Sequence, residues 1–225
     1  SYELAMGLSI IAILMLSGSL STKNIVEVQQ AGHWNILYQP LGFIIFIVCA
    51  FAECNRTPFD LPECETELIG GYHTEYSSMK LGFYLFSEYI NMFISGAVMA
   101  TLYFGGYDYP GFTFMLGKFG NNVAVLLGVG ALILKAIFFI FIFMWVRWTI
   151  PRFRYDQLMN LGWTGLIPLA MFNVVLTGGV MLFTVNEGGS NWITVAASWA
   201  GVALMLVVTA FYSQMQYKKK KFATA

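Results

Sequence analysis

Long apolar stretches separated by shorter polar links dominate this chain of 225 residues. A helix needs roughly 20 apolar residues to cross the hydrocarbon of a bilayer, and it satisfies its own backbone polar groups there. The stretches that fit this description predict spans at about 2–19, 37–52, 81–104, 123–145, 161–185 and 192–212. We therefore expect a single all-α transmembrane domain over residues 1–225, built as a bundle of about six helices.

The polar links carry charges of opposite sign. Residues 53–80 form an acidic loop, and the stretch 53–88 holds seven of the chain's twelve acidic residues, whereas residues 146–160 form a basic link. Nine Lys and Arg residues lie on the side shared by these links and the C-terminal tail, while Lys23 and Lys118 lie opposite. The positive-inside rule therefore places an ordered acidic loop, the basic link and both termini in the cytoplasm. The lysines at 218–221 predict contact with anionic lipids.

Composition supports the membrane class and argues against several others. The chain is 58% hydrophobic and 11% charged, against roughly 25% charged residues in a typical soluble domain. A formal net charge of zero gives no support for a nucleic-acid partner. The cysteines Cys49, Cys54 and Cys64 lack metal-ligand spacing, and the sequence has no glycine-rich phosphate loop. We expect no metal, NAD, FMN or iron–sulfur cluster to be bound by this chain.

Glu88 and Lys135 fall well inside predicted spans, whereas Glu3 stands at the start of the first. Glu88 lies eight residues beyond Lys80, on the order of 12 Å along a helix, which is too deep for a short carboxylate to reach water. It belongs either to an ion or proton path, or to a protonated carboxyl group bonded to a neighbouring helix. Lys135 requires an acid, a carbonyl group or water as its partner. Glu3 and Glu88 are candidate acids, and both a structural and a transport role remain open.

The acidic loop has residues suited to holding protons. Glu63, Glu65 and Glu67 would share one face of an extended segment, and the first and last would be neighbours on a helix. Crowded carboxylates raise one another's pKa and hold exchangeable protons, unless the loop is simply solvated. His73 either titrates or only forms hydrogen bonds. Phe59 suits loop packing or contact with a lipid-soluble ring.

Two longer motifs point to a family. The stretch AECNRTPFDLPECETELIGGYHTEYSSMK, residues 52–80, closely resembles the quinone-side loop of the H-type membrane subunit (subunit 1 in mitochondria) of the proton-pumping NADH:quinone oxidoreductase, respiratory complex I. The stretch WVRWTIPRFRYDQLMNLGW, residues 145–163, resembles the other cytoplasmic motif of that subunit. The opening SYELAMGL and Lys135 fit as well, so the resemblance covers essentially the whole chain.

The resemblance implies a membrane subunit of a translocating oxidoreductase, with no complete active site in this chain alone. It would join the redox arm to the pump, and its partners would be quinone-site and cluster-bearing hydrophilic subunits, small membrane subunits, antiporter-like subunits, lipids and the quinone substrate. The residues matching the family's proton path are Glu3, Glu53, Glu63, Glu65, Glu67, Glu75, Glu88 and Lys135. Those matching its quinone cavity are Arg56, Phe59 and Asp60, and those matching a docking motif are Arg147, Arg152, Arg154 and Asp156.

Some features depart from the family or leave alternatives. The family's subunit is longer at its N-terminus, and the first apolar stretch here begins without a leader. We therefore expect this chain to be the C-terminal part of such a subunit, whether truncated, split or seen in part. The alternatives are the equivalent subunit of a membrane-bound hydrogenase, a secondary ion transporter, and a structural anchor for a redox complex. The motif NRTPFDLPE favours the quinone-reducing enzymes over the related hydrogenases. The sequence as a whole favours a bacterial plasma membrane over the mitochondrial inner membrane.

Overall fold

The computed structural model describes residues 2–61, 69–109, 121–187, 195–196 and 199–203, and all regular secondary structure in these parts is helical. The elements are α1 (Tyr2–Ser17), α2 (Thr22–Ala31), α3 (Asn35–Tyr38), α4 (Pro40–Glu53), the 3₁₀ turn η1 (Gly71–Thr74), α6 (Ser78–Tyr103), α8 (Asn121–Thr149), α9 (Tyr155–Asn160), the π-helical turn η2 (Leu161–Leu166) and α10 (Ile167–Glu187). The prediction of an all-helical chain is confirmed for this part.

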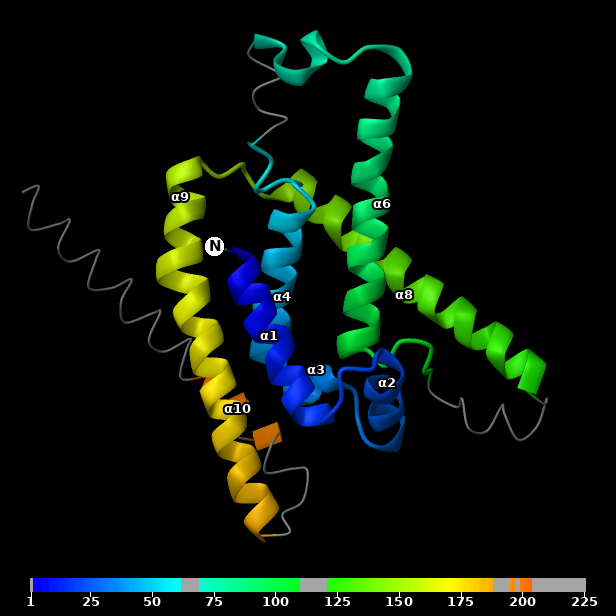
Figure 1. Cartoon of the computed structure of the whole chain (residues 1–225), viewed down its shortest axis with the longest axis vertical. Coiled ribbons are helices and arrows are strands. Elements are labelled where there is room, and N and C mark those ends of the chain that lie inside the picture. Colours follow the sequence, from blue (N-terminus) through cyan, green and yellow to red (C-terminus); the bar gives the residue numbers. More distant parts are fainter. Residues whose placement is uncertain (1, 62–68, 110–120, 188–194, 197–198, 204–225) are drawn as a thin grey trace, which may run out of the picture.

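Helices α1, α4 and α10 form the centre of the molecule, with α1 packed against both of the others (Figure 1). Ile13 of α1 and Phe46 and Ala50 of α4 are at most 3% exposed. The small residues Ala5 and Ala12 are fully buried on α1, which allows the neighbouring backbones to come close. Because α1 and α4 run in opposite directions, α1 begins at the end of the bundle where α4 finishes.

Helices α6 and α8 form a second packed pair. They cross at Gly96, where an added Cβ atom would lie 3.1 Å from the carbonyl oxygen of Ala136 and 3.3 Å from the Cβ atom of Phe139. A glycine is therefore required for the two backbones to approach this closely. The Phe43 ring of α4 lies 5.2 Å from the Tyr103 ring and 6.3 Å from the Phe139 ring, which joins this pair to the central helices.

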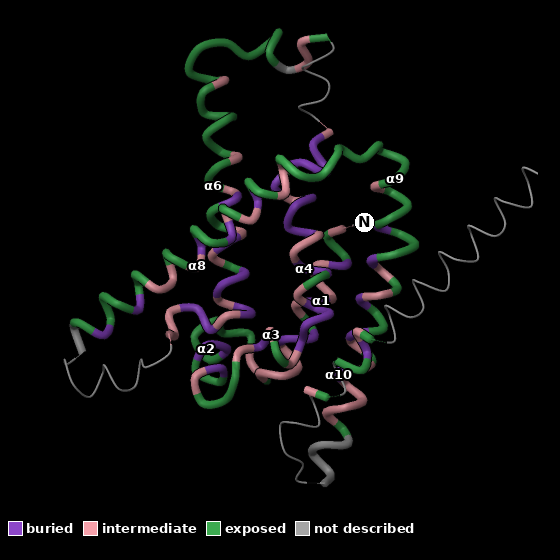
Figure 2. Tube along the Cα trace, turned by 180° about the vertical axis from the view of Figure 1, so that it is seen from behind, coloured by how far each residue is buried: buried purple, intermediate pink, exposed green. Residues whose placement is uncertain are grey.

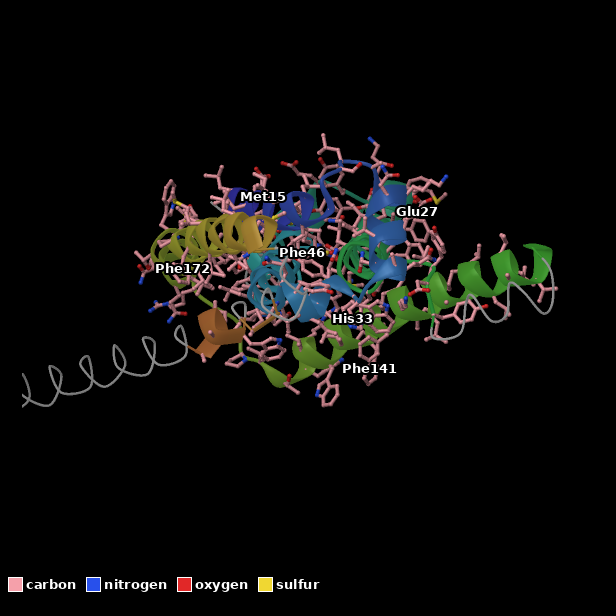
Figure 3. The ribbon with its side chains drawn as sticks, turned by 90° about the horizontal axis from the view of Figure 1, so that it is seen from below. Met15, Glu27, His33, Phe46, Phe141 and Phe172 are labelled. Atoms are coloured by element: carbon pink, nitrogen blue, oxygen red, sulfur yellow. The ribbon has the colours of Figure 1, made fainter. Side chains whose placement is uncertain are left out.

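Apolar residues also cover much of the outer surface. The first halves of α6 and α8 extend away from the packed centre and are largely exposed (Figure 2). Seen from below, Phe46 lies within the bundle, whereas Phe141 and Phe172, which are 57% and 42% exposed, lie on its outside (Figure 3). Apolar side chains on the outside as well as the inside of a helix bundle are expected for a protein surrounded by lipid.

Side chains from distant segments bond the last carbonyl groups of α6. The Gln29 side-chain amide donates to the carbonyl oxygens of Thr101 and Leu102, at 3.1 and 3.3 Å, and that of Asn35 donates to Leu102 at 2.9 Å. The Gln29 carbonyl oxygen accepts a hydrogen bond from the backbone of Gly105 at 2.9 Å. These bonds satisfy carbonyl groups that have no partner within the helix itself, so α2 and α3 fix where α6 ends.

A second buried polar cluster joins α10 to the start of α4. The Gln39 side-chain amide donates to the Thr177 hydroxyl at 2.7 Å and its carbonyl oxygen accepts from the Asn173 amide at 3.0 Å. All three residues are at most 3% exposed. Hydrogen bonds between helices of this kind hold membrane bundles together because the groups have no access to water.

The predicted spans agree only in part with the helices. Three described helices are long and apolar enough to cross a membrane, Ser78–Tyr103, Val123–Thr149 and Tyr155–Leu182, and α1 with α2 would make a fourth if this pair, bent by 57°, were one span. The apolar α4 is shorter than that, and the predicted span 192–212 lies mostly outside the described residues. The predicted basic link 146–160 is also too long, because α8 runs to Thr149 and α9 begins at Tyr155.

Candidate functional site

The two longer motifs of the sequence meet in the structure. The Phe59 and Phe153 rings stack with their centroids 5.6 Å apart and their planes 21° from parallel. The backbone N–H of Phe153 donates to the Pro58 carbonyl oxygen at 2.9 Å. An Arg152 guanidinium nitrogen lies 3.9 Å from an Asp60 carboxylate oxygen, and the Asp60 side chain is 3% exposed. The segment between α8 and α9 thus packs directly on the turn that follows α4.

That turn places a buried arginine beside Glu88. A terminal nitrogen of Arg56 lies 3.6 Å from a Glu88 carboxylate oxygen, with the two side chains 6% and 26% exposed. The Arg56 guanidinium also lies over the ring of Tyr89, 4.8 Å from its centroid. Charge pairing and the face of an aromatic ring both stabilise a guanidinium that is removed from water. Glu88 is therefore an ion-paired residue at the edge of the bundle.

A cavity of about 200 Å³ opens beside this ion pair, between α6 and α8. Its walls are mostly apolar and aromatic, with two arginines, and consist of Arg56, Tyr89, Met92, Phe143, Met144, Arg147 and Trp148. Of the three residues predicted to line a quinone cavity, Arg56 is in these walls. Phe59 and Asp60 are not among the residues that line it, and they contact Phe153 and Arg152.

Two other predicted acids, Glu53 and Glu3, have contacts with residues of α1 or α6. The Tyr2 hydroxyl lies beside the Glu53 carboxylate, and Glu3 is close to the same tyrosine. The Asn91 amide donates to the Glu53 backbone carbonyl at 3.3 Å. Because Asn91 is one turn of α6 beyond Glu88, the end of α4 is level with the Arg56–Glu88 pair.

The remaining predicted residues have different surroundings. Glu75 and His73 are exposed at the η1 turn, and Glu63, Glu65 and Glu67 lie outside the described residues. Arg154 and Asp156 are exposed at the start of α9, where the Arg154 backbone N–H bonds the Gln157 side chain at 3.1 Å.

Lys135 lies beside the C-terminal end of α6, far along the helix from Glu88. Its ammonium group donates to the carbonyl oxygens of Phe104 and Gly106, at 2.6 and 3.0 Å, and to that of Asp108. It also lies 5.0 Å from the centre of the Trp34 ring. Glu88 and Phe104 are roughly 24 Å apart along the helix. Of the partners considered from the sequence, the carbonyl groups are those observed, and this favours the structural role for Lys135.

Several residues of the site were missed in the sequence. Tyr89 and Asn91 follow Glu88 on the same helix, and Phe153 lies inside the second motif between two arginines. Their proximity to a predicted charge was a usable signal. Nothing in the sequence spacing indicates that Gln29 and Asn35 would bond the end of α6, because those contacts bring together segments about seventy residues apart.

Apolar helices that place a buried charge pair and a small apolar cavity at one end define a helical membrane protein with a charged site at the end of its spans. The chain matches the model of the NADH dehydrogenase family over residues 1–178. It belongs to this family, and the resemblance seen in the two motifs is confirmed.

Three bacterial relatives, all named as subunits of NADH-quinone oxidoreductases, are closely similar to the chain. The H-type subunit from Flavobacterium johnsoniae is 64% identical over 182 residues, 81% of this chain and 52% of the relative. An H-type subunit from Cytophaga hutchinsonii is 66% identical over 182 residues, 81% of this chain and 53% of the relative. Subunit 8 from Rhodothermus marinus is 49% identical over 193 residues, 82% of this chain and 57% of the relative. The chain thus spans about half the length of the curated relatives it matches.

Proposed function

We propose that this chain forms the quinone-side part of the membrane subunit of a proton-pumping NADH:quinone oxidoreductase. The three relatives are all named as subunits of an NADH-quinone oxidoreductase, which favours it over the hydrogenase and transporter alternatives. The observation that carries the proposal is the Arg56–Glu88 pair, 3.6 Å apart at the edge of an apolar cavity. In this proposal Arg56 binds the quinone, and its ion pair with Glu88 supports a link to an acid that can take up a proton.

The cavity has the chemistry needed for a quinone ring. Its aromatic and methionine side chains suit the apolar ring faces, and the Arg56 and Arg147 guanidinium groups can donate to the quinone oxygens. A volume of about 200 Å³ is below the roughly 300–1,000 Å³ of typical small-molecule sites. We therefore propose that the ring enters this cavity while the apolar tail lies outside it.

The ion pair links quinone reduction to protonation. Reduction of a quinone to a quinol takes up two electrons, which a cluster-bearing partner subunit would deliver, and two protons. Negative charge on the ring draws the Arg56 guanidinium away from the Glu88 carboxylate. Without the nearby positive charge, the charged form of a carboxyl group loses part of its stabilisation, and in this proposal Glu88 then takes up a proton.

From Glu88 the proposed path continues through Glu53 to Glu3 on α1, since Asn91 and Tyr2 connect these helices. The acids of the loop, Glu63, Glu65, Glu67 and Glu75, would supply protons to it. Net transport requires two states with different proton affinities. The partners would be the hydrophilic quinone-site and cluster-bearing subunits, the small membrane subunits and the antiporter-like subunits, in a bacterial plasma membrane with both termini cytoplasmic.

The test compares Glu88→Gln with Glu27→Gln in the assembled complex. Glu27 is an exposed acid on α2 that pairs with Lys23 at 3.7 Å, so it controls for the loss of one carboxylate. We expect Glu88→Gln to lower both quinone-dependent NADH oxidation and proton uptake into vesicles by at least tenfold. NADH oxidation by an artificial acceptor should be unchanged. Equal activity of the two variants with quinone would contradict the proposal.

A further inference from the structure

Arg56 lies in the turn that follows α4, between Glu53 and Leu61. Within this turn, the Phe59 backbone N–H donates to the Arg56 carbonyl oxygen at 2.9 Å. On the other side, the Arg56 N–H bonds the Phe51 carbonyl oxygen at 3.4 Å. The position of Arg56 therefore depends on where Phe59 is held.

Phe59 is held by the segment that follows α8. Phe153 contacts this turn through both a stacked ring and a backbone hydrogen bond, and Arg152 adds a charge pair to Asp60. Phe59 and Asp60 are 6% and 4% exposed, and Phe59 also belongs to the main hydrophobic core cluster. Three contacts of different chemistry thus reach three consecutive residues, Pro58, Phe59 and Asp60.

We propose that Arg152 and Phe153 clamp the turn and position Arg56 for quinone binding. This inference rests on the proposed role of Arg56 in the quinone cavity. Arg152 would then act within the chain, whereas the family resemblance implies that it docks a partner subunit. Arg152 and Phe153 are positioning residues, since they act on the ligand through Arg56.

The clamp matters for the cavity because the two arginines that line it come from different segments. One guanidinium of the cavity comes from the turn, at Arg56, and the other comes from the last turns of α8, at Arg147. Arg152 follows Arg147 by five residues, so the clamp ties the turn to the same helix end that carries the opposite wall. Displacement of a binding group by about 1 Å can weaken a site by orders of magnitude.

The experiment measures the KM for a water-soluble quinone and kcat in the assembled complex. Phe153→Ala and Arg152→Gln should each raise KM roughly tenfold while kcat changes less than twofold. Phe153→Tyr keeps the stacked ring and should restore the wild-type KM. Lys23→Gln is the control, because it removes an exposed cation from α2 that belongs to neither motif.

A double substitution separates a clamp from two independent effects. If Phe59 and Phe153 act only on each other, Phe59→Ala, Phe153→Ala and the double variant should raise KM equally, whereas independent residues would multiply their effects. A normal KM for Phe153→Ala and Arg152→Gln overturns the clamp. So does a reduced amount of assembled Arg152→Gln complex with a normal KM, which would indicate partner docking.

Failure of the clamp and failure of the proposed function give different results. If Phe153→Ala is silent while Glu88→Gln abolishes quinone reduction, the clamp is wrong and the proposed function stands. If Glu88→Gln is silent while Phe153→Ala raises the KM, the clamp stands and the proton path is wrong. If both variants behave as wild type, both proposals are wrong.

Discussion

Replacing Lys135 by Met tests what holds α8 to the end of α6. Methionine keeps an unbranched side chain of similar length but removes the ammonium group. The carbonyl oxygens of Phe104, Gly106 and Asp108 then lose a charged donor. The Trp34 ring, now 5.0 Å from that charge, loses a cation–π contact.

The size of the effect follows from these contacts. Each hydrogen bond to a charged group contributes about 1.5–3 kcal/mol, and a cation near a helix C-terminus adds about 0.3–1 kcal/mol. The bonds share one donor group and do not add, and removing the ammonium also removes its desolvation cost. We therefore expect a loss of about 3 kcal/mol in the free energy of unfolding. In a protein of this size, that lowers Tm by about 6–12 °C.

Thermal unfolding of this chain purified in detergent, followed by circular dichroism, measures the shift. Leu134→Met is the matched control, because Leu134 is the preceding residue of α8 and is 70% exposed. If Lys135→Met unfolds at the same temperature as Leu134→Met, these contacts do not stabilise the bundle. A loss of proton pumping at unchanged Tm would instead support the transport role.

Two further changes test other parts of the structure. Gly96→Ala should destabilise the bundle by about 1–3 kcal/mol, since the new methyl group would lie 3.1 Å from a backbone oxygen of α8. Gly130→Ala is the control in the same Tm assay, because a methyl group there would have nothing within 4 Å. Equal Tm values for the two variants would argue against the close crossing. Burial raises the pKa of the Cys54 thiol to about 11, so its thiolate fraction at pH 8 is roughly a hundredfold below that of a thiol at its ordinary value. With the other cysteines replaced by Ala, iodoacetamide should label Cys54 correspondingly slowly before denaturation; fast labelling measured by mass spectrometry would contradict its burial.

The sequence predicted the long apolar helices well, because hydropathy over a whole span is a strong signal. The predicted span 81–104 became α6, Ser78–Tyr103, and 123–145 lies within α8, Asn121–Thr149. The predicted boundaries differ from those of the helices where polar residues continue a helix beyond its apolar stretch. The helix Tyr155–Leu182 begins within the predicted basic link, since charged residues end a hydropathy window but do not end a helix.

The site was predicted in its residue types and only partly in its contacts. Arg56 and Glu88 were both singled out, but their pairing at 3.6 Å depends on a turn that no sequence period describes. The two interpretations of Phe59, loop packing or contact with a lipid-soluble ring, differ in the group that its side chain contacts. In the structure its ring stacks on that of Phe153. The partners of Lys135 could not be chosen from the sequence, because a backbone carbonyl group leaves no sequence signal.

Two places along α6 hold charge in different ways, and this separates their roles. Near the middle of the helix Arg56 faces the carboxylate of Glu88, and a carboxylate can change its charge by taking up a proton. At the C-terminal end the Lys135 ammonium bonds backbone carbonyl groups, which do not take up protons near neutral pH. The proposed function therefore assigns the response to quinone reduction to the first place, whereas the second fixes α8 against α6. We expect Glu88→Gln to lower pumping and, because it unpairs a buried arginine, also to lower Tm, whereas Lys135→Met should lower Tm and leave pumping intact. Measuring both quantities on both variants tests this division, and a loss of pumping in Lys135→Met or normal pumping in Glu88→Gln would refute it.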